Sequence, residues 1–228
     1  MWDTIIAGTR HTLEFARHAG TKKFLLTSSG AVYGRQPPDM THIPEQYTGA
    51  TDQTDPCSAY GEGKRAAEML CTMYTKMYGI QTKIARCFAF VGPYLPLDIH
   101  YAIGNFIRDG LRGGPIAITG DGTPYRSYLY AADLAIWLLT ILFLGVPSRP
   151  YNVGSDRDVT IKQLADIVAN IFEPARTVEL HKKPIAGHVP GRYVPSIQEA
   201  SHILNLAVHT DLQDAIERTI AWHKQRHH

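Results

Sequence analysis

The chain has 228 residues, of which 44% are hydrophobic and 19% are charged. This composition is ordinary for a globular protein and excludes a disordered or fibrous class. Lysine and arginine total 23 against 21 aspartates and glutamates, which gives a net charge of +2. Without a basic stripe, the sequence does not favour nucleic acid as a partner.

The cysteines and the apolar segments indicate the cellular compartment that we expect for this protein. Three cysteines (Cys57, Cys71 and Cys87) cannot form a full disulfide framework, and their spacing fits no zinc site. A reducing cytosol is the plain interpretation, so we expect a cytoplasmic protein without a metal. The longest apolar run, residues 134–146, is shorter than the roughly 20 residues that cross a bilayer. It therefore predicts a buried helix and no membrane partner.

Apolar spacing and turn residues predict the elements in chain order. Helices are expected over 1–19, 58–78, 100–112, 133–144, 160–172 and 211–223, and strands over 23–28, 82–88, 116–119, 127–130, 151–153, 178–181 and 193–196. Gly79 should end the second helix. Thr160 and Gln163 should form a capping box, and Asp133 should cap the helix that it begins.

Helices and buried strands alternate over the first 90 residues, which predicts an α/β fold with a parallel sheet. The short mixed elements after residue 90 predict a smaller α+β region interleaved with it. We expect one domain to comprise 1–90 and 131–155, and the second to comprise 91–130 and 156–228.

Tyr60 and Lys64 carry the clearest chemical signal. Residues four apart lie on the same helix face, and a lysine ammonium beside a tyrosine favours the phenolate that acts as a base. Ser28 and Ser29 close the preceding strand, at the edge where open parallel sheets bind ligands. On this motif alone, a half-buried aromatic residue beside a solvated lysine is the more common explanation.

Five linked motifs change that balance. They are TSSGAVYG (27–34), YGEGK (60–64), RCFAFVGP (86–93), GDGTPYRSYLYAADLA (120–135) and YNVGS (151–155). In this order and spacing the chain resembles the extended short-chain dehydrogenase/reductases, in particular the NAD-dependent nucleotide-sugar epimerase/dehydratases. The resemblance covers essentially the whole chain and implies a partial Rossmann-like parallel sheet with an interleaved substrate-binding region.

The resemblance also implies roles for single residues. Tyr60 matches the catalytic base, and Lys64 matches the lysine that tunes it and holds the nicotinamide ribose. Ser29 matches the residue that bonds the reacting sugar oxygen. Arg126 matches an arginine that contacts the substrate diphosphate, and Arg192 is a weaker candidate for a second contact, since guanidinium groups pair well with phosphate. An exposed surface charge is the alternative for each arginine.

Two small residues separate the subclasses of this family. Dehydratases have an acidic pair after the strand serine or threonine, because eliminating water needs two titratable groups. Here those positions are Gly30 and Ala31. The pattern favours an NAD-dependent epimerase that acts on a nucleotide-activated sugar through a keto intermediate. A 4,6-dehydratase or a reductase remains an alternative.

The glycine-rich turn that cradles a dinucleotide in this family is missing. None of the 19 glycines belongs to a GxxGxxG that follows a predicted strand and opens a helix. We expect about 80–100 residues of the family's fold to precede this chain, at roughly 30 residues per βαβ unit. A truncated, catalytically silent binding protein is therefore a further alternative.

Assembly is predicted from the first two helices. In the family they commonly pair with their copies as a four-helix bundle, so we expect a homodimer. Leu13 on the first helix could form the contact, together with Met69, Met73 and Met77, which repeat every fourth residue on the second. Alternatively, they face the sheet of their own subunit.

Overall fold

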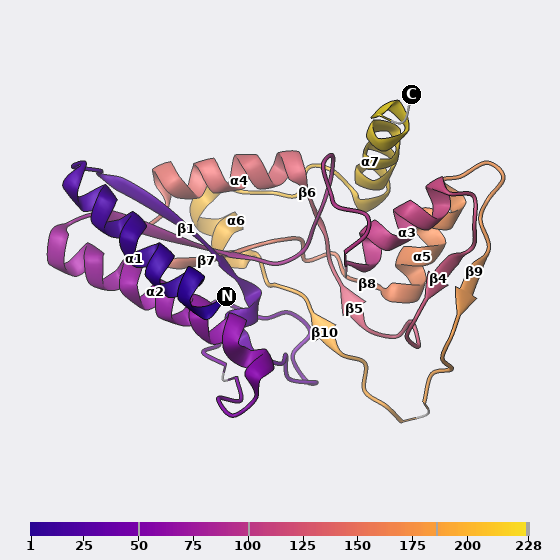
Figure 1. Cartoon of the computed structure of the whole chain (residues 1–228), viewed down its shortest axis with the longest axis horizontal. Helices are drawn as coiled ribbons and strands as arrows, with labels where there is room; N and C mark the ends of the chain where they lie inside the picture. The colour runs from indigo at the N-terminus through magenta and orange to yellow at the C-terminus, as the bar shows by residue number, and fades with distance from the viewer. Residues whose placement is uncertain (50, 100, 186, 227–228) are drawn as a thin grey trace.

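The computed structural model describes residues 1–49, 51–99, 101–185 and 187–226 (Figure 1). Its helices are α1 (Trp2–His18), α2 (Ala59–Tyr78), α3 (Ala102–Leu111), α4 (Ala131–Leu144), α5 (Ile161–Asn170), α6 (Gln198–Leu204) and α7 (Leu212–Arg226), with short 3₁₀ turns η1 (Gly30–Tyr33) and η2 (Pro56–Ser58). Its strands are β1 (Lys23–Ser29), β2 (Gln81–Cys87), β3 (Phe90–Val91), β4 (Ile116–Ile118), β5 (Tyr125–Arg126), β6 (Leu129–Tyr130), β7 (Pro150–Val153), β8 (Val159–Thr160), β9 (Val178–Leu180) and β10 (Arg192–Tyr193).

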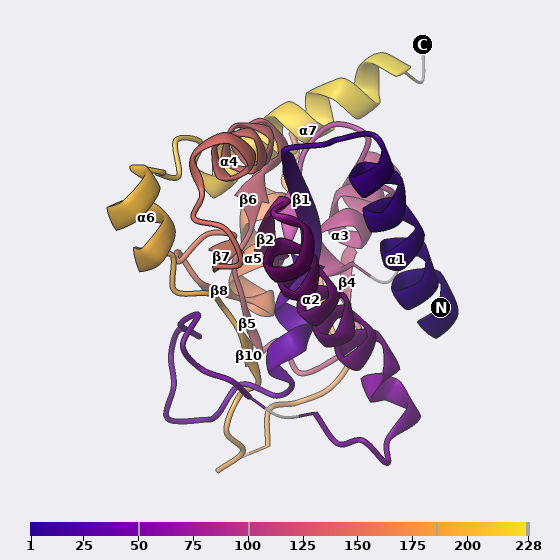
Figure 2. The same cartoon turned by 90° about the vertical axis from the view of Figure 1, so that its left-hand side faces the viewer.

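A parallel sheet of order β1-β2-β7 organises the first part of the chain. Helices α1 and α2 lie on one face, and α4 and α6 lie on the other (Figure 2). Side chains alternate along each strand, so Leu26 packs with α1 and α2 while Leu25 packs with α4. The predicted α/β class with a partial Rossmann-like sheet is confirmed.

The register of this sheet fixes where chemistry can gather. Ser29 lies opposite Cys87, and Cys87 lies opposite Val153. The three strands therefore end together, and the carboxyl edge carries the segment 28–31 from β1 and the segment 87–90 from β2.

A second core lies beside the sheet, around α3, α5 and the parallel pair β4 and β9 (Figure 1). Its buried apolar residues come from 91–130 and 156–220. Residues 197–206, which we assigned to the second region, pack instead on the sheet side, where Ala200 shares a core with Trp137 of α4. Strand β5 joins β10 and β8 in a small separate sheet.

Helix α4 corrects the prediction of a buried helix. Only Trp137 and Ile141 among its apolar side chains are fully buried, whereas Leu139 and Phe143 are each 57% exposed. The helix packs one face on the sheet and leaves the other open. Within the described residues, no helix is long and apolar enough to cross a membrane.

Two of the three predicted helix-end signals are confirmed. Gly79 ends α2 in the left-handed conformation (φ +70°), and Thr160 and Gln163 form the expected capping box. Asp133 does not cap α4, which begins two residues earlier. Its buried carboxylate instead accepts the backbone N–H groups of His209 and Thr210 and fastens the C-terminal segment to α4.

Candidate functional site

A cavity of about 770 Å³ opens between the carboxyl edge of the sheet and the second region. From the sheet side it is lined by Ser28, Ser29, Ala31, Tyr60, Cys87 and Phe88, and from the second region by Tyr101, Ala102, Arg126, Tyr128, Ile161 and Tyr193. The structure thus brings together three residues that the sequence singled out: Ser29, Tyr60 and Arg126. Lys64 and Arg192 are not on the cavity wall.

Helix α2 presents Tyr60, Lys64 and Glu68 on one face, because they are spaced four residues apart. The Lys64 ammonium donates to the carbonyl oxygen of Thr27 at 2.9 Å and lies 5.8 Å from the centre of the Tyr60 ring. The Tyr60 side chain is 38% exposed. Lys64 therefore places a positive charge behind the phenol and keeps two N–H groups for other partners.

Ser29 ends β1 and is 7% exposed. Its oxygen accepts the backbone N–H of Ala31 at 3.2 Å. The side chain is thus held at the cavity wall by a contact within its own turn.

Alternation along β5 and β10 explains the different places of the two arginines. Arg126 lies opposite Tyr193 in the ladder, and both reach the cavity. Arg192 and Tyr125, one residue earlier in each strand, point to the other face. There the Arg192 guanidinium pairs with Asp158 at 2.7 Å and stacks 3.8 Å over the Tyr125 ring centre.

Tyr193 is a cavity residue that the sequence did not reveal. Tyr193 reaches the cavity because it pairs with Arg126, which lies 67 residues earlier in the chain. Only the folded structure shows this pairing. The ring of Tyr193 also contacts Phe88, with a centroid separation of 4.7 Å.

Gly30 is required by the close approach of these two rings. A Cβ atom at this position would lie 2.7 Å from Phe88 Cζ and 2.7 Å from the Tyr193 hydroxyl oxygen. Both distances are shorter than a van der Waals contact. The space that a side chain at residue 30 would need is therefore already filled.

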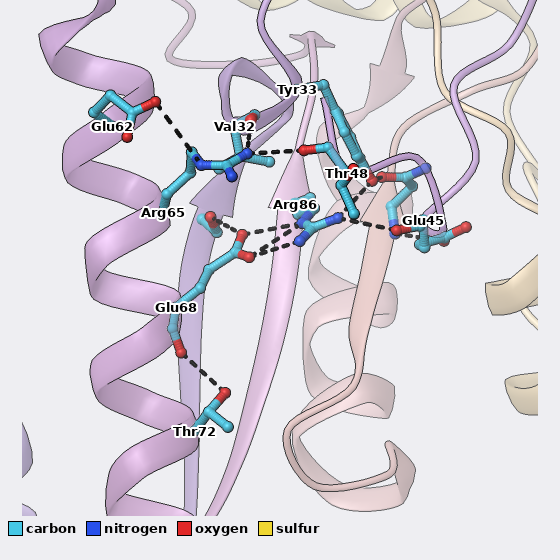
Figure 3. Close-up of polar contacts among 11 residues, drawn as sticks. Val32, Tyr33, Glu45, Thr48, Glu62, Arg65, Glu68, Thr72 and Arg86 are labelled. Carbon is cyan, nitrogen blue, oxygen red and sulfur yellow. Dashed lines mark hydrogen bonds and ion pairs between the residues drawn. The ribbon is translucent and has the colours of Figure 1, made fainter. Parts of the chain in front are cut away.

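A buried polar network joins Glu68, Arg86 and Tyr33 (Figure 3) and reaches the cavity wall at Ser28. Glu68 of α2 accepts the Ser28 hydroxyl at 2.6 Å and pairs with the Arg86 guanidinium at 2.7 Å. Arg86 also donates to the Tyr33 hydroxyl at 2.9 Å, which donates in turn to Asn152 at 2.7 Å. The network joins α2 to β1, β2, β7 and η1, and so fixes the helix of Tyr60 against the strand of Ser29.

Burial sets the protonation of the other polar groups on the cavity wall. It raises the pKa of Tyr128 and of Tyr193 to about 12, and the pKa of the Cys87 thiol to about 11. At neutral pH the two phenols are therefore neutral donors, and Cys87 is a neutral thiol rather than a nucleophile.

A second recess of about 250 Å³ adjoins the first and shares Ala102 and Ile161 with it. It is lined by Asn105, Phe106 and the turn 117–122. Arg126 lines the larger cavity next to it.

Comparisons with known proteins match this chain in sequence and in fold. The sequence profile described as "NAD dependent epimerase/dehydratase family" matches residues 1–154. UDP-glucuronic acid decarboxylase 1 of Arabidopsis thaliana is 32% identical over 228 residues, which covers 98% of this chain and 50% of that protein. The chain thus spans about half the length of this relative.

Solved structures show the same fold. UDP-glucose 4-epimerase of Thermotoga maritima, solved with UDP-glucose, matches with a TM-score of 0.87 at 24% identity. The match covers 100% of this chain and 71% of the epimerase chain. UDP-glucuronic acid 4-epimerase of Bacillus cereus, solved with NAD, matches with a TM-score of 0.81 at 25% identity. This match covers 97% of this chain and 65% of the epimerase chain.

Proposed function

Because the chain belongs to the NAD-dependent epimerase/dehydratase family, we propose that it epimerises a nucleotide-activated sugar through a transient keto intermediate. In this proposal Tyr60 takes the proton of a sugar hydroxyl and returns it. Lys64 favours its phenolate, Ser29 holds the sugar oxygen, and Arg126 pairs with the diphosphate. Since the chain spans half of the relative's length, this activity is proposed for the whole protein.

The observation that carries the proposal is the chemistry of the cavity wall. Among the described residues that line it, none is an aspartate or a glutamate, and Arg126 is the one charged side chain. A guanidinium suits an anionic diphosphate. Eliminating water would need an acid and a base besides the tyrosine. The space that an acidic side chain at residue 30 would need is filled by Phe88 and Tyr193.

Decarboxylation of a nucleotide-linked uronic acid is the second candidate. The Arabidopsis relative carries that activity in its name. Oxidising the 4-hydroxyl of a uronic acid gives a β-keto acid, which loses CO₂ without an acid on the cavity wall. The same Tyr60 would start either reaction.

NAD is the cofactor that both candidates imply, and it supplies a site that takes and returns a hydride. The hydrogen-bonding groups of this chain fit the nicotinamide end of NAD. The Tyr60 hydroxyl and the two spare N–H groups of Lys64 suit the hydroxyls of the nicotinamide ribose. The sequence contains no glycine-rich turn for the pyrophosphate.

Proton NMR of the sugar region tests the function. The whole protein, of which this chain is the part described, is incubated with NAD and either UDP-glucose or UDP-glucuronic acid. The proposal expects the 4-epimer of one substrate to appear without a change in mass. A pentose product with released CO₂ would establish the second candidate, and a 4-keto-6-deoxy sugar would contradict both.

Cofactor affinity gives a separate prediction. We expect this chain to bind NAD weakly or not at all in a calorimetric titration, because the pyrophosphate finds no helix N-terminus with a glycine turn. A dissociation constant in the low micromolar range would contradict this expectation.

We also propose that α1 and α2 form a homodimer contact. The structure places Met69, Met73 and Met77 on the outer face of α2, at 61%, 45% and 61% exposure. The expectation for Leu13 was wrong, because this residue is fully buried against α2 and the sheet, and Phe15 is the exposed apolar residue of α1, at 72%. Burying such a stripe against a second copy would be favourable, since methionine adapts to irregular surfaces.

The expected result is a dimer by light scattering at tens of micromolar, and a monomer after Met73→Lys. A charge in the centre of the stripe would be buried without a partner. His202→Lys, which adds a charge to exposed α6, should leave the dimer intact. A wild-type monomer, or a dimer that survives Met73→Lys, would count against this contact.

A further inference from the structure

A further recess, of about 140 Å³, adjoins the main cavity and is lined by apolar and aromatic side chains. Five of its seven lining residues also line the cavity: Phe88, Ala89, Phe90, Tyr101 and Tyr128. The other two, Leu95 and Ile103, line this recess and not the cavity. The apolar recess is therefore a side space of the cavity rather than a separate pocket.

The register of the sheet places the apolar recess at the reacting end of the cavity. Cys87 lies opposite Ser29 in the ladder, and Phe88 follows Cys87 directly. The Phe88 ring also lies beside Gly30, where a Cβ atom would be 2.7 Å from it. Among the described residues, the recess at the turn 117–122 has no lining residue in common with the apolar recess. Of the two, the apolar recess is the neighbour of Ser29.

The lining sets what the apolar recess can accept. Among the described residues that form it, none carries a charge. Ile103 is 1% exposed and Tyr128 is 8% exposed, so this wall is almost closed to water. An apolar cavity of about this size stays dry and takes a small apolar group. A carboxylate would lose its water there without gaining a partner, whereas a methyl group would gain from burial.

We propose that the apolar recess selects a nucleotide sugar that carries a methyl group, either the C6 methyl of a 6-deoxy sugar or the methyl of an acetamido group. This inference rests on the proposed function, because it presumes a sugar in the cavity. A uronic acid finds no cation in the recess, since Arg126 lines the cavity and not this side space. The recess therefore favours epimerisation of a methyl-bearing sugar over decarboxylation of a uronic acid.

Calorimetric titration of the whole protein, with NAD present, tests this selection. The probes are UDP, UDP-glucose, UDP-6-deoxyglucose and UDP-N-acetylglucosamine. We expect one of the two methyl-bearing sugars to bind about four- to tenfold more tightly than UDP-glucose, the effect of burying one methyl group. The probe that shows this preference identifies which methyl the recess takes.

Two substitutions of Leu95 separate the recess from the cavity. Leu95→Phe fills part of the recess, and Leu95→Asn keeps the size of the side chain but makes the wall polar. Each should reduce the preference for the methyl-bearing sugar to about twofold or less, while the affinities for UDP and UDP-glucose stay within about twofold. Leu139→Phe, at a position of α4 that is 57% exposed, is the matched control and should change none of the four affinities.

The outcomes distinguish this inference from the function beneath it. A wild-type protein that binds none of the four probes would contradict the proposed function, and the inference with it. Wild-type binding of UDP-glucose that is at least as tight as that of both methyl-bearing sugars would overturn the inference alone. A methyl preference that persists in both Leu95 variants would also overturn it.

Discussion

Replacing Arg86 with alanine is expected to lower the free energy of unfolding by about 3–5 kcal/mol, the cost of leaving one member of a buried ion pair without its partner. The Arg86 and Glu68 side chains are only 14% and 11% exposed. Without the guanidinium, Glu68 keeps only the Ser28 hydroxyl, and Tyr33 loses a donor. Urea denaturation measures the loss.

The exposed pair between Arg218 and Asp214 is the matched control. Its N–O distance of 2.9 Å is nearly that of the buried pair, but its side chains are 57% and 43% exposed. Arg218→Ala should therefore cost less than about 1 kcal/mol. The double variant Glu68→Gln with Arg86→Met should be more stable than Arg86→Ala, because no buried charge is left over. A loss below about 1 kcal/mol for Arg86→Ala would contradict the structural role given to the network.

The sequence predicted those parts of the fold that depend on neighbours in the chain. Gly79 and the pair of Thr160 and Gln163 are signals within one helical turn, and both are confirmed. The apolar run at 134–146 predicted a helix correctly, but composition cannot say which face of it is covered. That depends on the sheet, which reaches only the Trp137 side.

The sequence did not predict contacts between segments that are far apart in the chain. Arg192 is the weaker candidate for a second diphosphate contact, since a guanidinium pairs well with phosphate. Its direction depends on the pairing of β10 with β5, and that pairing brings Tyr193 to the cavity in its place. Asp133 looked like a cap because aspartate caps helices well. Its true partners, the backbone N–H groups of 209 and 210, lie more than seventy residues away.

Tyr60→Phe is expected to reduce turnover of the nucleotide sugar by about 10²- to 10⁴-fold, the contribution of a general acid–base group. The substitution removes one oxygen from a side chain that is 38% exposed at the cavity wall. UDP-glucose affinity should change little, because Arg126 and the adjoining recess lie in the second region. The NMR assay gives the rate, and the thermal midpoint should stay within about one degree of wild type.

The control for this substitution is Tyr193→Phe. Tyr193 lines the same cavity, and burial raises its pKa to about 12. Its phenol is therefore neutral at neutral pH and is not a base. Tyr60→Phe should slow the chemical step with substrate still bound, while Tyr193→Phe should keep a turnover well above that of Tyr60→Phe. A Tyr60→Phe protein that keeps a tenth or more of the wild-type rate would remove Tyr60 from the reaction and leave the cavity without a base.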